Sequence, residues 1–179
     1  MMNRKEFLKS TSLLMGGAIV SSTVNARLFS SEINTLNLRK SLGFGMIGEK
    51  DLSLEDKLKL VKDIGFDGVE FNSPVEFSLK SIIRAKDKAG IATPSTINKD
   101  HWSKPLSDPD PSIRQFTIES VARSLEETKE MEGDTVLIVP GVVNEKVSYA
   151  QAYKNALESI RKLIPYVEKT GIKIGIENV

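Results

Sequence analysis

Residues 54–71 read LEDKLKLVKDIGFDGVEF, and their hydrophobic period changes once, at Gly65. Before this glycine, the apolar residues Leu58, Val61 and Ile64 recur at the spacing of an α-helix. After it, residues 69–71 are typical of a short strand. Glycine ends helices readily because it adopts the left-handed conformation at low cost. The stretch therefore predicts a helix, a glycine stop and a strand, in that order.

The same order recurs along the rest of the chain. Helical stripes end near Gly90, Gly133 and Gly171, and strands are predicted directly after them at residues 91–95, 135–139 and 173–177. A further strand is predicted at residues 41–47. Helices that alternate with strands in this way require a parallel sheet with helical crossovers. The residues alone fit two architectures, an open doubly wound sheet and an eight-stranded barrel.

Composition excludes several classes of protein. The chain has 179 residues, a formal net charge of +1, one His and no Cys. The absence of cysteine excludes disulfides, thiolate zinc sites and cysteine nucleophiles. The near-neutral charge gives no support for a nucleic-acid partner, which would require clustered Lys and Arg. Since there is one histidine, a metal site with several ligands must consist mostly of carboxylates or lie partly outside this chain.

Residues 1–26 have the layout of an export signal. Arg4, Lys5 and Lys9 precede a short apolar run, and small residues up to Ala26 offer a cleavage point. The run is too short for a stable membrane span. Residues 3–9 resemble the twin-arginine motif with Lys5 in place of the second arginine, so this route and the Sec route both stay open. An ordinary amphipathic helix is the alternative. We expect export to the periplasm, with residues 27–40 as a polar connector.

Residues 43–48 match the pattern G-x-G-x-x-G of dinucleotide-binding proteins. That motif requires a strand directly before the first glycine and a helix that opens at the last one. Here the polar residues 39–41 come before the glycines, and the next helix begins only after Ser53. We therefore assign the glycines to the first strand and predict no nucleotide cofactor.

Two carboxylates lie in or directly after predicted strands. Glu70 belongs to the second strand, and Glu177 ends the fifth strand between apolar neighbours. In parallel α/β proteins, functional groups gather at the carboxyl ends of the strands. A carboxylate there costs free energy unless it is paired, protonated or bound to a metal. Glu70 also fits a salt bridge with a neighbouring cation, whereas the predicted burial of the fifth strand makes that alternative weaker for Glu177.

His101 and Trp102 follow the third predicted strand. An imidazole can hydrogen-bond a sugar hydroxyl, and an indole face can pack on sugar C–H groups. A single histidine is also common as an ordinary core or surface residue. Its position beside the only tryptophan, on the expected ligand-facing edge, makes the pair a candidate sugar-binding site.

Four of these segments, taken in order, resemble the xylose isomerase-like TIM barrels. They are residues 53–70, residues 101–110 beginning with His101-Trp102, residues 136–141 and residues 174–179. The resemblance is to the sugar phosphate isomerase/epimerase branch, which includes hexulose-phosphate isomerases and tagatose epimerase-like enzymes, and it covers residues 41–179. It implies a (β/α)8 TIM barrel that is incomplete here, with about five strands and four helices.

The resemblance also implies a mechanism. In that family, the glutamate that ends the fifth strand binds a divalent metal, often manganese, and takes part in proton transfer beside a carbonyl. Glu177 matches that position, and Glu70 and His101 would position the sugar. The other ligands, an Asp, a His and a second Glu, are expected beyond residue 179. Because a barrel takes about 250 residues, we expect this chain to be the N-terminal part of a longer enzyme and inactive alone.

Two other functions stay open. One is a non-catalytic, exported carbohydrate-binding barrel. The other is an endonuclease acting at abasic DNA sites, which would rely on several histidines and a basic surface that this sequence lacks. The expected partner is a small sugar. The fifth strand, residues 173–177, is predicted to be an exposed apolar edge through which copies of the chain self-associate.

Overall fold

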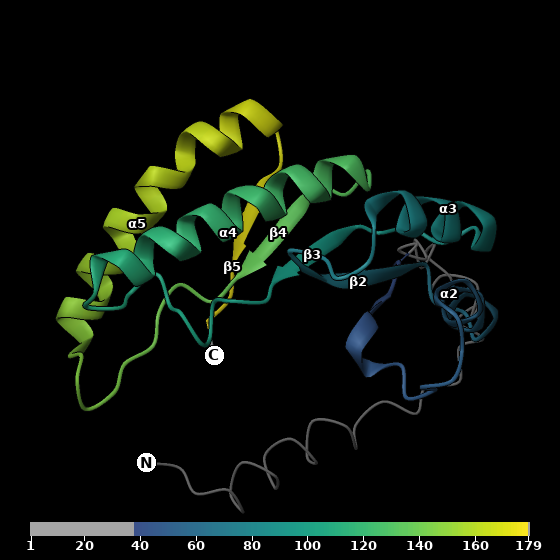
Figure 1. Cartoon of the computed structure of the whole chain (residues 1–179), viewed down its shortest axis with the longest axis horizontal. Helices are drawn as coiled ribbons and strands as arrows, with labels where there is room; N and C mark the ends of the chain where they lie inside the picture. The colour runs from purple at the N-terminus through teal and green to yellow at the C-terminus, as the bar shows by residue number, and fades with distance from the viewer. Residues whose placement is uncertain (1–37, 179) are drawn as a thin grey trace, which may run out of the picture. The chain divides into compact units, whose positions relative to one another are not determined.

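The computed structural model describes residues 38–178, so the predicted export signal and nearly all of the predicted connector lie outside the described residues (Figure 1). The described elements are, in chain order, β1 (Ser41–Gly43), the 3-10 helix η2 (Phe44–Met46), α2 (Leu54–Asp63), β2 (Gly68–Ser73), α3 (Leu79–Ala89), β3 (Ser95–Asn98), α4 (Pro111–Glu130), β4 (Thr135–Ile138), α5 (Tyr149–Thr170) and β5 (Lys173–Ile176).

The five strands of the described chain form one parallel sheet in the order β1-β2-β3-β4-β5 (Figure 1). Each strand pairs with the next one in sequence, whereas a doubly wound sheet reverses its strand order at a switch point. Burial alternates along β2, where Val69, Phe71 and Ser73 are buried while Glu70 and Asn72 are not. The helices therefore cover one face of the sheet. This arrangement is a partial (β/α)8 barrel, and it excludes the doubly wound alternative.

Polar side chains mark the beginning of each α-helix in residues 38–178. Ser53, Ser78, Asp110 and Ser148 are the N-caps, and the side-chain oxygen of each accepts a backbone N–H from the first turn. Such a cap satisfies one of the N–H groups that a helix start leaves without a partner. The capping residues, together with Gly90 and Gly171 in left-handed conformations at two helix ends, explain why the chain turns from helix to strand at these points.

The end of α4 differs from the prediction. Glu132, not Gly133, adopts the left-handed conformation there, with φ of 64°. The Lys86 ammonium lies 2.6 Å from the Glu132 carboxylate. Position 133 requires glycine for a different reason, which is that a side chain does not fit there. A Cβ on Gly133 would lie 2.8 Å from both the Thr93 carbonyl oxygen and Thr128 Cγ2.

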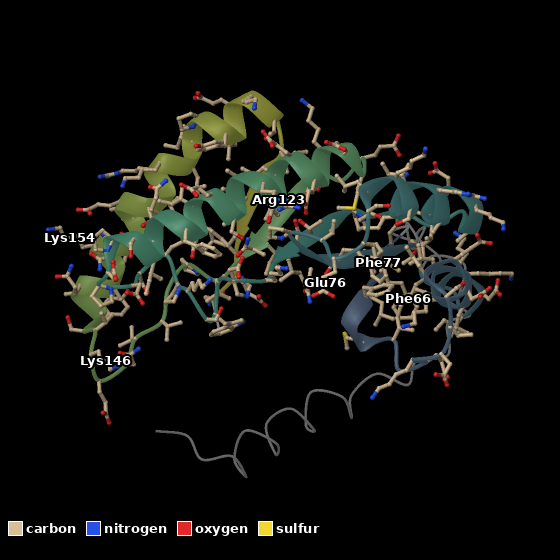
Figure 2. All side chains as sticks on the ribbon, viewed as in Figure 1. Phe66, Glu76, Phe77, Arg123, Lys146 and Lys154 are labelled. Carbon is tan, nitrogen blue, oxygen red and sulfur yellow. The ribbon has the colours of Figure 1, made fainter. Side chains whose placement is uncertain are left out.

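Two predicted strands begin or end elsewhere. The third strand was expected at residues 91–95 but spans Ser95–Asn98, and of residues 91–94 only Ala92 makes a bridge, to Gly68. Pro94 explains the shift because it has no N–H to donate to a ladder. The first strand ends at Gly43, and the chain then turns into η2. Phe44 of η2 stacks on Phe71 at 4.8 Å and meets Phe77, which is labelled in Figure 2, edge-on at 5.5 Å.

The core consists of two apolar clusters on the helix-covered face. The first joins α2, β2 and α3 and contains Leu58, Val61, Val69, Phe71, Ile82, Ala85, Ile91 and Met131. The second lies under α4 and α5 and contains Leu106, Ile118, Val121, Leu125, Val136, Ile138, Leu163 and Ile172. This packing fixes the strands, and with them the loops at their carboxyl ends.

The fifth strand is an edge of the described sheet rather than the buried strand that its apolar sequence suggested. Its residues are half-buried or exposed, and Ile176 is 57% exposed. The predicted apolar edge is thus confirmed, while the predicted burial of this strand is wrong because no described strand covers its far side. No helix within residues 38–178 is long and apolar enough to cross a membrane.

Candidate active site at the carboxyl ends of the strands

Main-chain groups at the end of β4 anchor two of the predicted site residues. The N–H of Glu177 donates to the carbonyl oxygen of Ile138 at 3.0 Å. The next N–H along, that of Val139, donates to Nδ1 of His101 at 3.1 Å. Consecutive residues at the end of β4 therefore hold the main chain of Glu177, after β5, and the imidazole of His101, from the loop after β3.

His101 is 4% exposed, whereas Glu177 is exposed. Burial lowers the pKa of His101 below its usual value, and the negative charges of Glu177 and Asp100 oppose this effect only in part. The ring is therefore neutral near pH 7. Because Nδ1 accepts a hydrogen bond from Val139, the single ring proton must be on Nε2.

Trp102 lies beside this ring. The two ring centroids are 5.6 Å apart at an interplanar angle of 85°, an edge-to-face contact, and Trp102 is 55% exposed. An exposed indole next to a polar ring is suited to pack on the C–H groups of a sugar. The structure thus brings together His101, Trp102 and Glu177, three of the four residues that the sequence singled out.

Glu70 does not join this group. Its carboxylate accepts hydrogen bonds from the hydroxyls of Ser41 at 2.9 Å and Ser95 at 2.8 Å, one on each neighbouring strand. The predicted alternative of a salt bridge is absent among the described residues, because serines rather than cations contact this carboxylate.

The strand register shows how far Glu70 lies from the strand ends. Ser95, its neighbour, pairs with Thr135, which pairs with Lys173. Glu177 is four residues beyond Lys173, a distance of about 13 Å at roughly 3.3 Å per residue. Glu70 thus lies deeper along the uncovered face of the sheet than Glu177.

A buried polar network holds the loop that carries His101. Asn98, at the end of β3, donates from its side-chain amide to the hydroxyls of Ser120 at 3.0 Å and Ser124 at 3.1 Å on α4. Its side-chain oxygen accepts the N–H of Asp100, and Ser120 in turn donates to the Asp100 carboxylate at 2.6 Å. The residue before His101 is therefore fixed through both its main chain and its side chain.

A second set of contacts ties the same loop to α5. Asn155 donates to the carbonyl oxygen of Ser107 at 3.1 Å, and Ser159 donates to that of Leu106 at 2.9 Å. The Ser107 hydroxyl accepts the N–H of Val142, in the loop after β4, at 2.9 Å. Sequence reasoning missed these residues. The signal that could have found them is polar residues on the apolar stripe of a helix at four-residue spacing, as with Asn155 and Ser159.

The described residues supply too few ligands for a metal ion. Residues 38–178 contain no group of three or more His, Asp or Glu side chains that could hold one. At the strand ends, Nδ1 of His101 accepts the N–H of Val139, and one oxygen of the Asp100 carboxylate accepts the hydroxyl of Ser120. Glu177 has the hard oxygen donors that a divalent cation such as manganese prefers. It fits as one ligand of such a site, and the described chain does not supply the rest.

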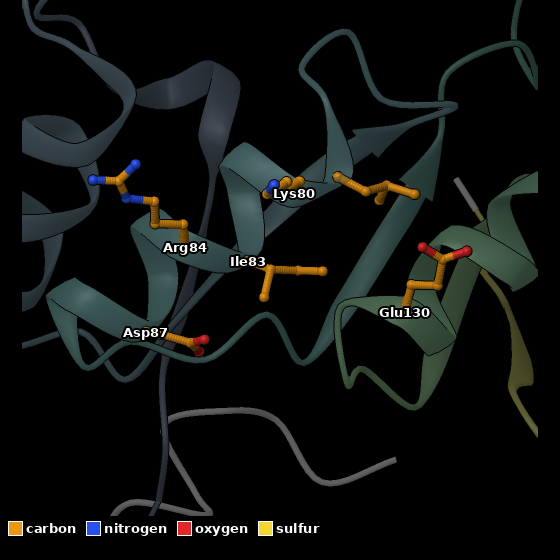
Figure 3. A pocket seen from close by; sticks show the side chains of 6 residues that line it. Lys80, Ile83, Arg84, Asp87 and Glu130 are labelled. Carbon is orange, nitrogen blue, oxygen red and sulfur yellow. The ribbon is translucent and has the colours of Figure 1, made fainter.

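A hollow of about 540 Å³ lies elsewhere, between α3 and α4 (Figure 3). Its lining residues are Leu79, Lys80, Ile83, Arg84, Asp87 and Glu130. It belongs to the helix layer and contains none of the predicted site residues, so it is separate from the strand ends.

The family model described as xylose isomerase-like TIM barrel matches residues 58–179, well over half of the chain. The chain belongs to this family. Because the match includes β2 to β5, it covers His101, Trp102 and Glu177. No curated protein matches the chain in sequence.

Solved structures that resemble this xylose isomerase-like barrel include several sugar epimerases. The 3-keto-D-glucoside 4-epimerase YcjR from E. coli has a TM-score of 0.63 and 19% identity, over 70% of this chain and 51% of the other. A D-psicose 3-epimerase solved in the presence of D-fructose has a TM-score of 0.66 and 19% identity, over 79% and 53%. An L-ribulose 3-epimerase has a TM-score of 0.66 and 16% identity, over 79% and 50%. The chain spans about half the length of these structures, and identities this low show the shared fold.

Proposed function

We propose that this barrel segment serves a sugar isomerase or epimerase that moves a proton on a carbon next to a carbonyl. The observation that carries the proposal is that the main-chain N–H of Glu177 and the ring of His101 are held by consecutive residues at the end of β4, through hydrogen bonds of 3.0 and 3.1 Å, and that the Glu177 charge acts on the ring. A carboxylate at the carboxyl end of a barrel strand can act as the base in proton abstraction, and an imidazole near it can hydrogen-bond the oxygen next to the reacting carbon. The epimerases among the structural neighbours support the same reaction class.

Each residue has a role in the proposal. Glu177 removes a proton from carbon, and His101 donates a hydrogen bond to a sugar oxygen. Trp102 packs against the C–H face of the sugar. Glu70, deeper on the same sheet face, contributes to binding a more distant hydroxyl, with Ser41 and Ser95 orienting its carboxylate.

A divalent cation, with manganese the first to test, belongs to the proposal. When bound, such a cation draws electrons from adjacent carbonyl and hydroxyl oxygens and so acidifies the C–H bond between them. Glu177 would be the ligand that this chain contributes. Because one carboxylate does not hold a divalent cation by itself, we expect residues 1–179 alone to have no epimerase activity with added manganese.

The cellular location is a separate proposal. The basic start and apolar run of residues 1–26 support export to the periplasm. Fractionation of cells that express the chain with a C-terminal tag would place it in the periplasmic or the cytoplasmic fraction, and recovery only from the cytoplasm would remove this part of the proposal.

The decisive test is a ketose epimerase assay of the complete reading frame that contains residues 1–179, with D-fructose and manganese. Glu177→Gln should lower kcat by a factor of about 10² to 10⁴, as expected for loss of a general base. Glu70→Gln should mainly raise KM, as loss of uniform binding does. Glu145→Gln is the matched control, because this exposed glutamate lies in the loop after β4 and should leave both constants unchanged.

The same assay separates the enzyme from a non-catalytic carbohydrate-binding barrel. Near-normal kcat in Glu177→Gln would remove Glu177 from the active site. Sugar binding without any turnover in the wild type would favour the non-catalytic alternative.

A further inference from the structure

The two ring nitrogens of His101 differ in their hydrogen bonds. Within residues 38–178, Nε2 of His101 has no hydrogen-bond partner, although Nδ1 is held by Val139. Among the described residues, Thr93 Oγ1 is the one fully buried side-chain nitrogen or oxygen atom that lacks a hydrogen-bond partner. Nε2 of His101 is not in this class of atoms. Nε2 is therefore not fully enclosed by the described residues, although His101 as a whole is 4% exposed.

The hydrogen bond from Val139 also fixes which nitrogen carries the proton. A main-chain N–H can only donate, so Nδ1 has to accept, and a neutral imidazole then carries its proton on Nε2. For Nε2 to become a metal ligand or a base, the proton would have to move to Nδ1 and face the N–H of Val139. Two donors would then oppose each other in a buried position, which costs free energy.

We infer that His101 is a fixed Nε2–H donor to the carbonyl oxygen of the substrate, and neither a metal ligand nor a proton carrier. The inference rests on the proposed function and assigns the chemistry of one residue within it. Glu177 lies close enough for its charge to act on the ring. The donor and the base thus lie near each other at the carboxyl ends of the strands.

The proposed proton abstraction breaks one C–H bond of the sugar and forms one O–H bond on Glu177. The C–H bond breaks, its proton goes to the Glu177 carboxylate, and its electron pair moves toward the adjacent carbonyl oxygen, which becomes an enolate oxygen. The Nε2–H of His101 strengthens its hydrogen bond to that oxygen without giving up the proton, because a neutral imidazole is a very weak acid. When a proton returns to carbon, the carbonyl forms again. A preorganised donor at a developing oxyanion lowers the barrier directly.

The first test reads the tautomer in the chain itself. His101 is the only histidine, so a sample labelled with ¹⁵N-histidine gives one pair of imidazole signals. At pH 7 we expect a protonated Nε2 and an unprotonated Nδ1. A proton on Nδ1, or on both nitrogens, would overturn the inference whatever the enzymatic function.

The second test uses the same chain labelled uniformly with ¹⁵N, so that main-chain amide signals are also seen. It adds a matched pair of probes, dihydroxyacetone and glycerol, which differ in the central carbonyl. Dihydroxyacetone should shift the Nε2–H signal, and glycerol should not. If the amide signals of Val139 and Glu177 move but Nε2–H does not, the donor role of His101 fails while the proposed sugar site stands. If dihydroxyacetone moves no signal at the strand ends, both the inference and the proposed sugar site fail.

A pair of variants distinguishes this role from a structural one in the epimerase assay. His101→Asn keeps an acceptor at the position of Nδ1 for Val139 but has nothing at Nε2, so kcat should fall by a factor of about 10² to 10³. His101→Gln can place its amide N–H near the Nε2 position and should lose roughly tenfold less. A merely structural histidine would give the reverse order, because Asn preserves the contact with Val139 and Gln does not.

Discussion

Glu127 on α4 accepts a 2.6 Å hydrogen bond from the hydroxyl of Ser73 at the end of β2, although 54 residues separate the two. The same carboxylate oxygen accepts the N–H of Val75 at 2.7 Å, and the other oxygen accepts Nε of Arg123 at 2.8 Å (Figure 2). Glu127 is 4% exposed. One buried carboxylate therefore joins the helix layer to the loop that follows β2, at the same edge of the sheet as His101 and Glu177.

Glu127→Gln should lower the free energy of unfolding by about 1–3 kcal/mol. A glutamine puts an N–H₂ group where one acceptor oxygen was, so a donor would face the donor of Val75 or Arg123 in a buried position. Urea denaturation measures the change. Glu130→Gln is the matched control, because Glu130 is exposed on the next turn of α4, and it should shift stability by less than about 0.5 kcal/mol. Equal effects of the two variants would contradict the assigned role of Glu127.

Gly141→Ala should destabilise the protein by about 1–3 kcal/mol, in the range of overpacked sites. A Cβ on Gly141 would lie 2.8 Å from Cβ and 2.9 Å from Oγ of Ser107, which is fully buried. The clash should separate the loops after β3 and β4. Gly45→Ala is the control, since a Cβ there meets nothing within 4 Å. Thermal unfolding compares the two variants, and a Gly141→Ala protein as stable as Gly45→Ala would show that the loops are free to move apart.

Stability should fall as the pH drops below the usual histidine pKa of about 6.5. Burial lowers the pKa of His101 in the folded chain, so the unfolded state binds a proton at a higher pH than the folded state does. The stability that neutral His101 contributes is complete above the unfolded pKa and is lost as pH falls through the folded pKa. Asp100 and Glu177 moderate the effect.

His101→Asn is the control for this pH dependence. The chain has no other histidine, so the variant should have a flatter stability profile between about pH 7 and the onset of carboxylate titration. Urea midpoints measured across this window provide the comparison. Parallel profiles for wild type and variant would contradict the burial argument.

Self-association of residues 1–179 should depend on Ile176, the exposed apolar residue at the end of the edge strand β5. An exposed strand edge is a template for pairing with another chain, and a charge on it opposes pairing. Sedimentation should show a self-associating wild type and a more monomeric Ile176→Lys. Ile64→Lys is the control, because Ile64 is 59% exposed against 57% for Ile176 but lies at the end of α2. A monodisperse wild-type monomer would contradict the prediction.

The alternation of helices and strands could be predicted from the sequence because it depends on local signals. Ser53 and Gly65 bracket α2 in the sequence, and the structure places the helix between them. The doubly wound alternative could not be excluded in this way, since both architectures use the same helix–strand unit. Strand order arises from pairing between distant segments, which no local pattern records.

The candidate site was likewise predictable from the sequence only in part. Glu177, His101 and Trp102 were recognisable because Glu177 ends a predicted strand and the His101-Trp102 pair lies in the loop that follows another. The anchorage of Glu177 and His101 was not, because Ile138 and Val139 hold these two residues through main-chain groups that every non-proline residue carries. The burial expected of β5 failed for a related reason: an apolar strand has the same sequence whether or not a neighbour covers its outer side.

The use of main-chain groups at the end of β4 has a consequence for how this site tolerates change. Ile138 contributes a carbonyl and Val139 an N–H, so their side chains are left to pack into the core. Exchanges among apolar residues at these two positions can adjust the core while His101 and Glu177 keep their anchors. Proline at position 139 is the exception, because it removes the donor. At these two positions, core packing therefore constrains the side chains, and the hydrogen bonds of the site constrain the main chain.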